Sequence, residues 1–312
     1  MFRNKEYILS VYREGGFTKA AEKMFISQPS LSASVKRIEE KIGLPIFDRS
    51  NAPLTLTEVG EEYVKYAMEI EQKEADFAKY VLDYGNLMVG KIKVGGSSFF
   101  SSFILPKMVS AFNSDYKKIV FELFEGSTKN LIGKLHTGEL DIVIDNAIIC
   151  DENIEGEVYM TERLLLAVPK DFVVNQELES MRITAKEIHN GAYLKKPAID
   201  LTILQNQPFV LLNSENDTGK RAEMFFKEYN INPNVLFRLD QQITVYNICC
   251  SGIGVSFVSD TLIKSIAFSK DIALYNLATP LAERKIYLYH KRNHYQSVVC
   301  RKFIEYALKK ER

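Results

Sequence analysis

The sequence predicts an α/β protein of three parts: a winged helix-turn-helix domain, a long helix, and an α/β domain of two lobes. Three observations support this prediction. Apolar residues recur at helical spacing around tight turns near the amino end, one apolar stripe then continues without proline, and strand-like and helix-like segments alternate afterwards. The expected ranges are 1–60 for the first part, 61–89 for the helix, and 90–312 for the α/β domain, with its first lobe at about 90–162 and 268–312 and its second at about 163–267.

Short helices joined by tight turns are predicted near the amino end. Apolar side chains at three- and four-residue steps indicate a first helix that ends at Gly15. Thr18 is the expected N-cap of a second helix, and Phe25 lies in the turn that follows. Ser27 is then expected to cap a third helix, with Pro29 in its first turn, where a missing N–H costs little.

The third helix has two chemically different faces. Leu31, Val35 and Ile38 repeat at helical spacing and predict a core face. The opposite face carries small polar side chains near its start and cations further along. Glutamine can pair with adenine in the major groove, serine can bond several base edges, and cations neutralise phosphates. The predicted DNA contacts are Ser27, Gln28, Pro29, Ser30, Ser32, Lys36, Arg37 and Arg49. The alternative is an ordinary solvated helix face.

A short hairpin is expected after the third helix, with Ser50–Pro53 at its tip, and it looks like the wing of a winged helix. The run FTKAAEKMFISQPSLSASVKRIEEKIGLPIFDR followed by LTLTEVGEEY resembles the N-terminal signature of LysR-type transcriptional regulators. The later run SGIGV, at 251–255, is similar to that family's glycine turn.

The resemblance implies a DNA-binding transcriptional regulator whose effector domain is built like a periplasmic binding protein. A small-molecule effector bound between the lobes would close or rotate them and so change the spacing and bend of bound DNA. The implied partners are double-stranded operator DNA with an inverted repeat, the effector, further copies of the chain, and RNA polymerase as one more candidate.

Composition limits how the chain binds DNA. The formal net charge is zero, and residues 1–60 hold nine Lys and Arg against seven Asp and Glu. Binding of one copy through charge alone should therefore be weak, and several copies would compensate through effective concentration. The amino end lacks a signal-peptide pattern and no apolar run approaches ~18 residues, so a cytoplasmic location without membrane contact is expected.

A long helix with one narrow apolar stripe is predicted from Glu58 to about Tyr84. At ~1.5 Å per residue it would run about 40 Å. A second copy of the same helix is the simplest partner for such a stripe, and packing against the chain's own α/β domain is the alternative. In the family that the chain resembles, this helix forms an antiparallel pair that holds two DNA-binding domains apart, which implies a homodimer or homotetramer.

Alternating strands and helices with short connections predict a parallel sheet from residue 90 onward. Ligands of such sheets lie beyond the carboxyl ends of strands, near helix N-termini, where N–H groups suit a small carboxylate or similar anion. The predicted effector contacts are Ser97, Ser98, Ser127, Thr128, Asn213, Ser214 and Gln241. By the resemblance, Ser97, Ser98 and Thr128 are the residues that best match the family's effector-contacting positions. Ordinary helix capping is the alternative for each residue.

Signals for catalysis are poor. The run NDTGK at 216–220 resembles half of a phosphate loop but lacks its first glycine and the Ser or Thr after lysine. His290 and His294 are four apart, but the intervening cations argue against a metal site. No catalytic residue, cofactor or metal is expected. The rival classes are a solute-binding protein, which needs a secretion signal and no helix-turn-helix, and an enzyme that uses the cleft.

The four cysteines show no CxxC spacing and predict no disulfide framework. Cys249 and Cys250 are adjacent and are expected on a partly buried helix. A redox-sensing role stays open for this pair, because reactivity depends on exposed thiolate.

Overall fold

The chain divides into two units, Met1–Leu87 and Met88–Arg312, each with its own apolar cores. The computed structural model describes residues 1–48, 53–84, 90–292 and 295–310. Arg49 and His294, singled out in the sequence, lie outside the described residues, as do 50–52 at the expected hairpin tip.

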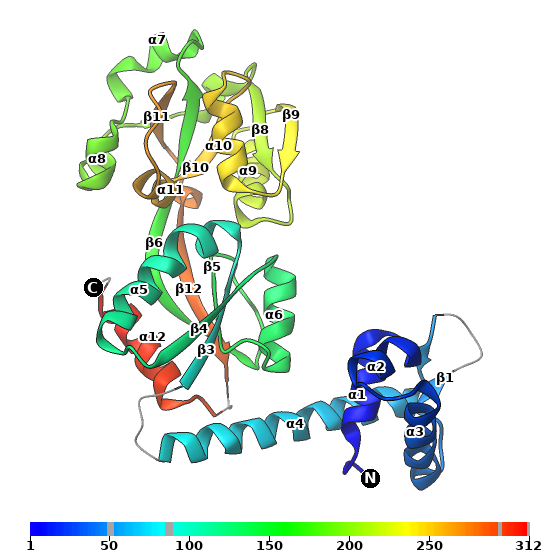
Figure 1. Ribbon diagram of the computed structural model, residues 1–312. Coiled ribbons are helices and arrows are strands. Elements are labelled where there is room, and N and C mark those ends of the chain that lie inside the picture. Colours follow the sequence, from blue (N-terminus) through cyan, green and yellow to red (C-terminus); the bar gives the residue numbers. More distant parts are fainter. Residues whose placement is uncertain (49–52, 85–89, 293–294, 311–312) are drawn as a thin grey trace. The chain divides into compact units, whose positions relative to one another are not determined.

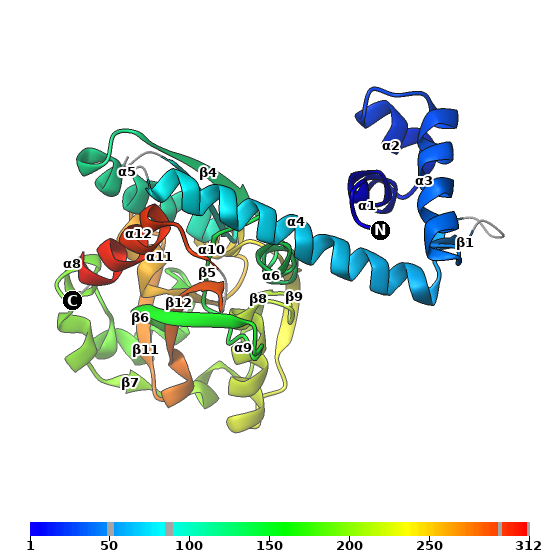
Figure 2. The ribbon, with the colours of Figure 1, turned by 90° about the horizontal axis from the view of Figure 1, so that it is seen from below.

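The first unit is a helix-turn-helix domain followed by a long helix. Its elements are α1 (Lys5–Glu14), α2 (Phe17–Lys23), α3 (Gln28–Ile42), β1 (Phe47–Asp48), β2 (Thr55–Leu56) and α4 (Glu58–Tyr84). Strands β1 and β2 pair antiparallel, which gives the base of the expected hairpin. Figure 2 shows the turn between α2 and α3. Leu31, Val35 and Ile38 are buried in one cluster with residues of α1, α2 and α4, so the predicted core face of α3 is present.

The second helix begins earlier than the sequence suggested. Thr18 is not its N-cap, because α2 begins at Phe17 and Gly16 occupies the cap position without a side-chain hydrogen bond. Phe17 packs against the core and its ring meets that of Phe47 edge-on, 5.7 Å between centroids. This contact draws Phe17 into the first turn. Gly15 ends α1 in the left-handed region at φ 66°, as expected of a C-cap glycine.

The long helix α4 has two different halves. Tyr63, Val64 and Ala67 are buried in the helix-turn-helix core. Further along, Phe77 is 68% exposed and Val81 is 52% exposed. The amino half of α4 is therefore part of the helix-turn-helix domain, and the carboxyl half presents exposed apolar side chains.

The second unit has a first lobe built on strands in the order β4-β3-β5-β12. Its elements are β3 (Gly90–Gly96), the π-helical turn η1 (Phe100–Ile104), α5 (Leu105–Asp115), β4 (Ile119–Glu125), α6 (Thr128–Thr137), β5 (Ile142–Asp145), β12 (Glu283–Lys291) and α12 (Val298–Lys310). Strands β3, β4 and β5 are parallel. Helices α5 and α12 cover one face of the sheet and α6 covers the other (Figure 1), which leaves two cores on opposite faces.

The second lobe surrounds the distal half of β6 (Ile154–Pro169). Its other strands are β7 (Ala198–Ile199), β8 (Pro208–Leu212), β9 (Asn234–Leu239), β10 (Ser256–Ser259) and β11 (Ile272–Leu277), and its helices include α8 (Ala185–His189), α9 (Asp217–Glu228), α10 (Gln242–Cys250) and α11 (Asp260–Ser265). Strands β10 and β11 pair antiparallel with β6, and β8 and β9 form a parallel pair. Gly254 lets the chain pass close to β8, because a Cβ there would meet the carbonyl oxygen of Pro208 at 2.8 Å.

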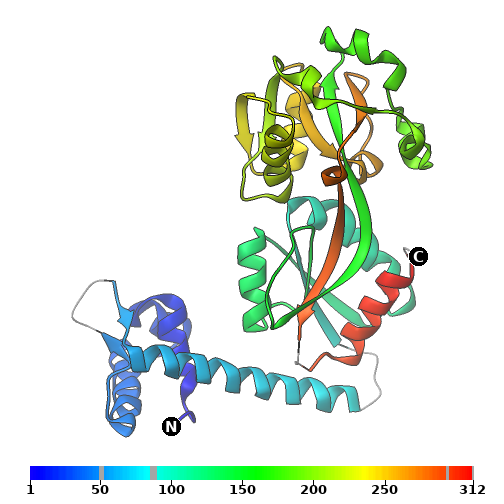
Figure 3. The ribbon, with the colours of Figure 1, turned by 180° about the vertical axis from the view of Figure 1, so that it is seen from behind.

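One expectation about the lobes needs correction. The range 268–282 packs in the second lobe, because β11 pairs with β6 and β7 and buries Leu274 and Tyr275 in second-lobe cores. Strand β6 runs unbroken from Ile154 to Pro169 and pairs with β12 in its first part. Figure 3 shows β6 passing from one lobe into the other beside β12. These strands are the covalent and hydrogen-bonded connection between the lobes.

Candidate functional site

The start of α3 presents polar side chains to solvent. Ser27 caps the helix, because its Oγ accepts a hydrogen bond from the Ser30 backbone N–H at 3.3 Å. Gln28, Pro29 and Ser30 are exposed in the next turn, and Ser32 is partly buried. The cations Lys36 and Arg37 are also exposed. The described candidates therefore share one accessible surface, hereafter the α3 surface.

Sequence reasoning missed one prominent residue beside the α3 surface. Phe25 is 96% exposed and has φ 55° in the turn before α3. A bulky residue with positive φ is uncommon, and the exposed ring gains nothing from burial. Phe25 lies two residues before Ser27, the cap of α3. The sequence placed Phe25 in a turn, and that prediction was the one indication that its side chain could be exposed.

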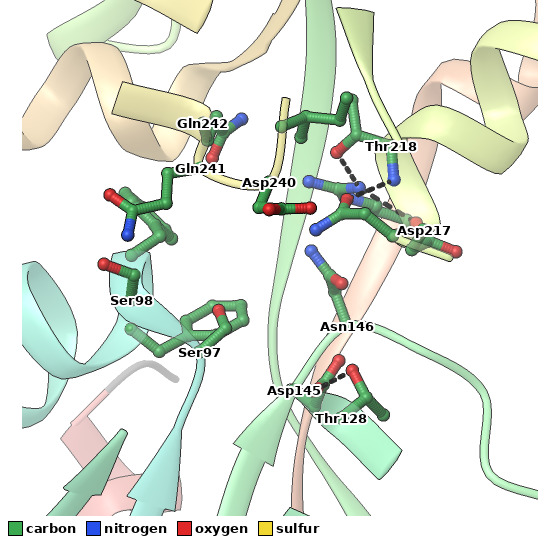
Figure 4. A pocket seen from close by; sticks show the side chains of 15 residues that line it. Ser97, Ser98, Thr128, Asp145, Asn146, Asp217, Thr218, Asp240, Gln241 and Gln242 are labelled. Atoms are coloured by element: carbon green, nitrogen blue, oxygen red, sulfur yellow. Dashed lines mark hydrogen bonds and ion pairs between the residues drawn. The ribbon is translucent and has the colours of Figure 1, made fainter. Parts of the chain in front are cut away.

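A pocket lies between the two lobes of the second unit (Figure 4), with an empty volume of about 480 Å³ that includes its open mouth. Its lining residues are Ser97, Ser98, Phe99, Phe100, Thr128, Asp145, Asn146, Leu212, Asn216, Asp217, Thr218, Asp240, Gln241, Gln242 and Arg284.

The strand ends build this pocket. In the first lobe, Ser97 and Ser98 follow the end of β3, and Asp145 ends β5. In the second lobe, Leu212 ends β8 and Asp240 follows β9. Because each pair of strands is parallel, the carboxyl ends of each pair meet at one sheet edge, and both edges face the pocket.

The predicted effector residues divide into two sets. Ser97, Ser98, Thr128 and Gln241 line the pocket. Ser127, Asn213 and Ser214 lie outside its lining: Ser127 accepts from the Asn130 N–H as the cap of α6, Asn213 donates to Asp240, and Ser214 is exposed. Capping, the alternative stated from sequence, describes Ser127 well.

Asp145 is the most buried carboxylate of the pocket, with 3% of its surface exposed. Its Oδ1 accepts from the Ala147 N–H and its Oδ2 from the Thr128 hydroxyl, both at 2.8 Å. Burial raises the pKa of Asp145, and these hydrogen bonds only partly oppose the shift. Sequence reasoning did not single out Asp145.

Arg284 closes the wall behind the pocket. Its Nε donates to Glu162 Oε1 at 2.7 Å, and its Nη1 donates to Asp217 at 2.9 Å and to Thr218 at 2.8 Å. Burial alone would lower the pKa of Arg284, but the charges of Glu162 and Asp217 outweigh it, so this pKa is raised. The NDTGK run thus forms a pocket wall, with Asn216 capping α9 through the Thr218 N–H.

The opposite wall contains an amide whose hydrogen-bonding capacity is not used. Gln242 is 8% exposed, and its Nε2 has no hydrogen-bond partner in the described part of the chain. It opens α10, whose N-cap residue Gln241 makes no side-chain cap. Buried amide groups are nearly always hydrogen-bonded, so this donor needs an acceptor from outside the chain.

The adjacent cysteines of α10 are wholly or partly buried. Cys249 is buried on α10, where its thiol donates to the Ala167 carbonyl at 3.4 Å, and burial raises its pKa. The pKa of the partly buried Cys250 is raised for the same reason. Within the described ranges, no cluster of His, Cys, Asp and Glu could hold a metal ion, and no helix there is long and apolar enough to cross a membrane.

Comparisons with known proteins agree with this architecture. The family model of the bacterial regulatory helix-turn-helix protein, lysR family, matches residues 2–61, and that of the LysR substrate binding domain matches residues 85–312. An uncharacterized HTH-type transcriptional regulator of Bacillus subtilis (strain 168), YcgK, is 26% identical over 303 residues, covering 96% of this chain and 91% of the relative.

Two solved structures share the fold along almost the whole chain. A full-length variant of OxyR from Pseudomonas aeruginosa has a TM-score of 0.69 and 21% identity, covering 99% of this chain and 93% of that chain. Full-length CbnR in complex with its target DNA has a TM-score of 0.62 and 17% identity, covering 99% of each chain. The chain belongs to the LysR family of transcriptional regulators. It is a DNA-binding regulator with an effector-binding domain, as the sequence predicted.

Proposed function

We propose that the α3 surface reads operator DNA and that a small molecule in the pocket between the lobes controls that binding. The supporting observation is the exposure of Gln28 and Ser30 at the start of a helix whose other face is buried core. The proposed base-reading residues are Gln28, Pro29, Ser30 and Ser32, and the proposed backbone contacts are Ser27, Lys36, Arg37 and Arg49.

Operator footprinting tests this assignment. Gln28→Ala should lose about 1–3 kcal/mol of specific binding, because a bidentate contact to a base disappears. Folding should be unaffected, since Gln28 is exposed. Gln176→Ala, an exposed glutamine of the second unit, is the matched control and should protect the operator like the unmodified protein. Unchanged protection by Gln28→Ala would remove α3 from the assigned role.

The effector half of the proposal rests on the pocket. Ser98→Ala combined with Thr128→Ala should abolish the thermal shift that an effector produces, because both hydroxyls line the cavity. Closure of the lobes about β6 and β12 would then alter how paired copies hold the operator. The inverted repeat of such an operator would match the symmetry of a homodimer or homotetramer.

The remaining features of the proposal follow from a regulator of this kind. It acts in the cytoplasm, where its DNA lies, with RNA polymerase as a further partner. The pocket would bind its ligand without transforming it, which fits the family of transcriptional regulators to which the chain belongs. Turnover of a candidate metabolite by the purified protein would contradict this point.

A further inference from the structure

The pocket walls carry more carboxylates than cations. Asp145, Asp217 and Asp240 line it, and Arg284 is the cation among the described lining residues. Arg284 is already paired with Asp217 and, behind the wall, with Glu162. Asp145 and Asp240 have no cation beside them in the described part of the chain. A ligand with only negative charge would meet two uncompensated carboxylates.

The groups at the Asp145 end of the pocket are arranged to accept hydrogen bonds. The Asp145 carboxylate accepts hydrogen bonds from the Thr128 hydroxyl and from the backbone at Ala147 and Asn146. A carboxylate has about four acceptor sites, so it can still accept one from a ligand. The Thr128 hydroxyl donates its hydrogen bond to Asp145, so its oxygen can only accept a hydrogen bond from a ligand. This end therefore favours a donor, and a positively charged donor most of all.

The other end of the pocket is arranged to donate. Figure 4 shows Ser98 and Gln241 facing one another, away from Asp145 and Thr128. The buried Nε2 of Gln242 lacks an acceptor within the described residues, and α10 begins there without a side-chain cap. Amide, hydroxyl and helix N-terminal N–H groups together suit a carboxylate.

We propose that the effector is a zwitterion: a compact molecule that carries both an ammonium group and a carboxylate. Its ammonium group lies against Asp145 and Thr128, with Asp240 at the mouth adding attraction. Its carboxylate lies against Ser98 and the amides of Gln241 and Gln242. This inference rests on the proposed function, because it names the class of molecule for the same pocket.

A matched panel of compounds tests the proposal on the full-length protein. The probes are the protein amino acids and ω-amino acids of three to six carbons, each beside its des-amino carboxylate and its decarboxylated amine. Thermal shift selects binders and calorimetry measures their affinity. At least one zwitterion should stabilise the protein. A compound that lacks either charged group should bind at least about tenfold more weakly, because charge-assisted hydrogen bonds are lost.

Variants locate the two ends of the ligand. Asp145→Asn with Asp240→Asn should weaken the zwitterion at least about tenfold and bring its affinity close to that of the des-amino compound. Gln242→Leu should instead weaken the zwitterion and the carboxylate together. Asp115→Asn, at an exposed aspartate outside the pocket, is the control and should change nothing.

Three results would overturn the inference. They are equal binding of the des-amino carboxylate and the zwitterion, unchanged binding by the Asp145 and Asp240 double variant, and no response to any compound of the panel. Operator footprinting separates these results from failure of the proposed function. A protein that still protects its operator but prefers plain carboxylates keeps the regulator assignment and loses only the zwitterion.

Discussion

Arg284 and Glu162 are cross-strand partners on β12 and β6, and their Nε–Oε1 hydrogen bond of 2.7 Å is almost completely buried. The exposed fractions of the two side chains are 1% and 0%. The same guanidinium holds Asp217 and Thr218 at the start of α9. One arginine thus joins the strands that connect the lobes to a wall of the effector pocket.

Removing this arginine should destabilise the effector domain strongly. Arg284→Met leaves the buried Glu162 carboxylate without its cation, which should cost about 3–5 kcal/mol in urea unfolding. Arg163→Met is the control on the same strand pair. Its partner Glu283 is half exposed, so that loss should stay below about 1 kcal/mol. If both substitutions lowered the free energy of unfolding equally, burial would not determine how much an ion pair stabilises the domain.

Gly60 should tolerate no side chain. It lies in the first turn of α4, and a Cβ there would approach the Ile46 carbonyl oxygen to 2.0 Å. Gly60→Ala should therefore separate α4 from the hairpin strand and lower the melting temperature of the first unit.

Gly133→Ala is the matched control for Gly60→Ala. Gly133 lies inside α6, and a Cβ there would meet no atom within 4 Å apart from its chain neighbours and the nearby helix backbone. Alanine there should therefore stabilise by about 0.5–1 kcal/mol. Differential scanning calorimetry measures the melting temperatures of the two variants. A Gly60→Ala protein that melts normally would contradict the close approach.

Glu187 should make stability depend on pH in acid. Hydrogen bonds from the backbone and side chain of Thr184, with Lys196 nearby, lower its pKa from 4.5 to about 2. Because the folded-state pKa is depressed, its stabilising effect is complete above pH 4.5 and disappears as pH falls toward 2. The difference in melting temperature between the unmodified protein and Glu187→Gln should shrink over that interval. A melting-temperature difference that stays constant over this pH interval would contradict the lowered pKa of Glu187.

Phe77 should contribute to self-association. It is exposed on the carboxyl half of α4, where its ring stacks near Tyr80 at 6.5 Å between centroids. Phe77→Ser removes apolar area from the proposed helix pair and should shift the protein toward monomer in analytical ultracentrifugation. Ala75→Ser, exposed on the same helix, should keep the original mass. Retention of the dimer by Phe77→Ser would place the interface elsewhere.

Cys249 should resist thiol reagents in the folded protein. Its buried thiol has a raised pKa, so little thiolate forms near neutral pH. Iodoacetamide should label the exposed Cys150 first and reach Cys249 only after unfolding, as peptide mass spectrometry would report. Labelling of both at one rate in the native protein would reopen a redox role.

Local patterns in the sequence predicted much of the fold. The cap of α3 at Ser27 and the end of α1 at Gly15 were expected and are present. These features depend on neighbours along the chain. Thr18 failed as a cap because a distant aromatic contact at Phe47 fixed where α2 begins.

The pocket was only partly predictable for the same reason. Ser97, Ser98, Thr128 and Gln241 could be placed from strand ends and family resemblance, and they do line it. Asp145 and Arg284 could not, because no local pattern distinguishes either residue. Their roles depend on partners that are remote in sequence: Arg284 meets Glu162 across 122 positions.

By itself, the sequence determined the class of protein, the helix-turn-helix with its exposed polar ridge, and the alternation that makes an α/β domain. Periodicity and capping are short-range effects, so they can be read along the chain. Only the tertiary structure decided the charge of the pocket and the lobe to which β11 belongs. Both follow from packing of distant segments, where burial fixes which charges are paired and which remain for a ligand.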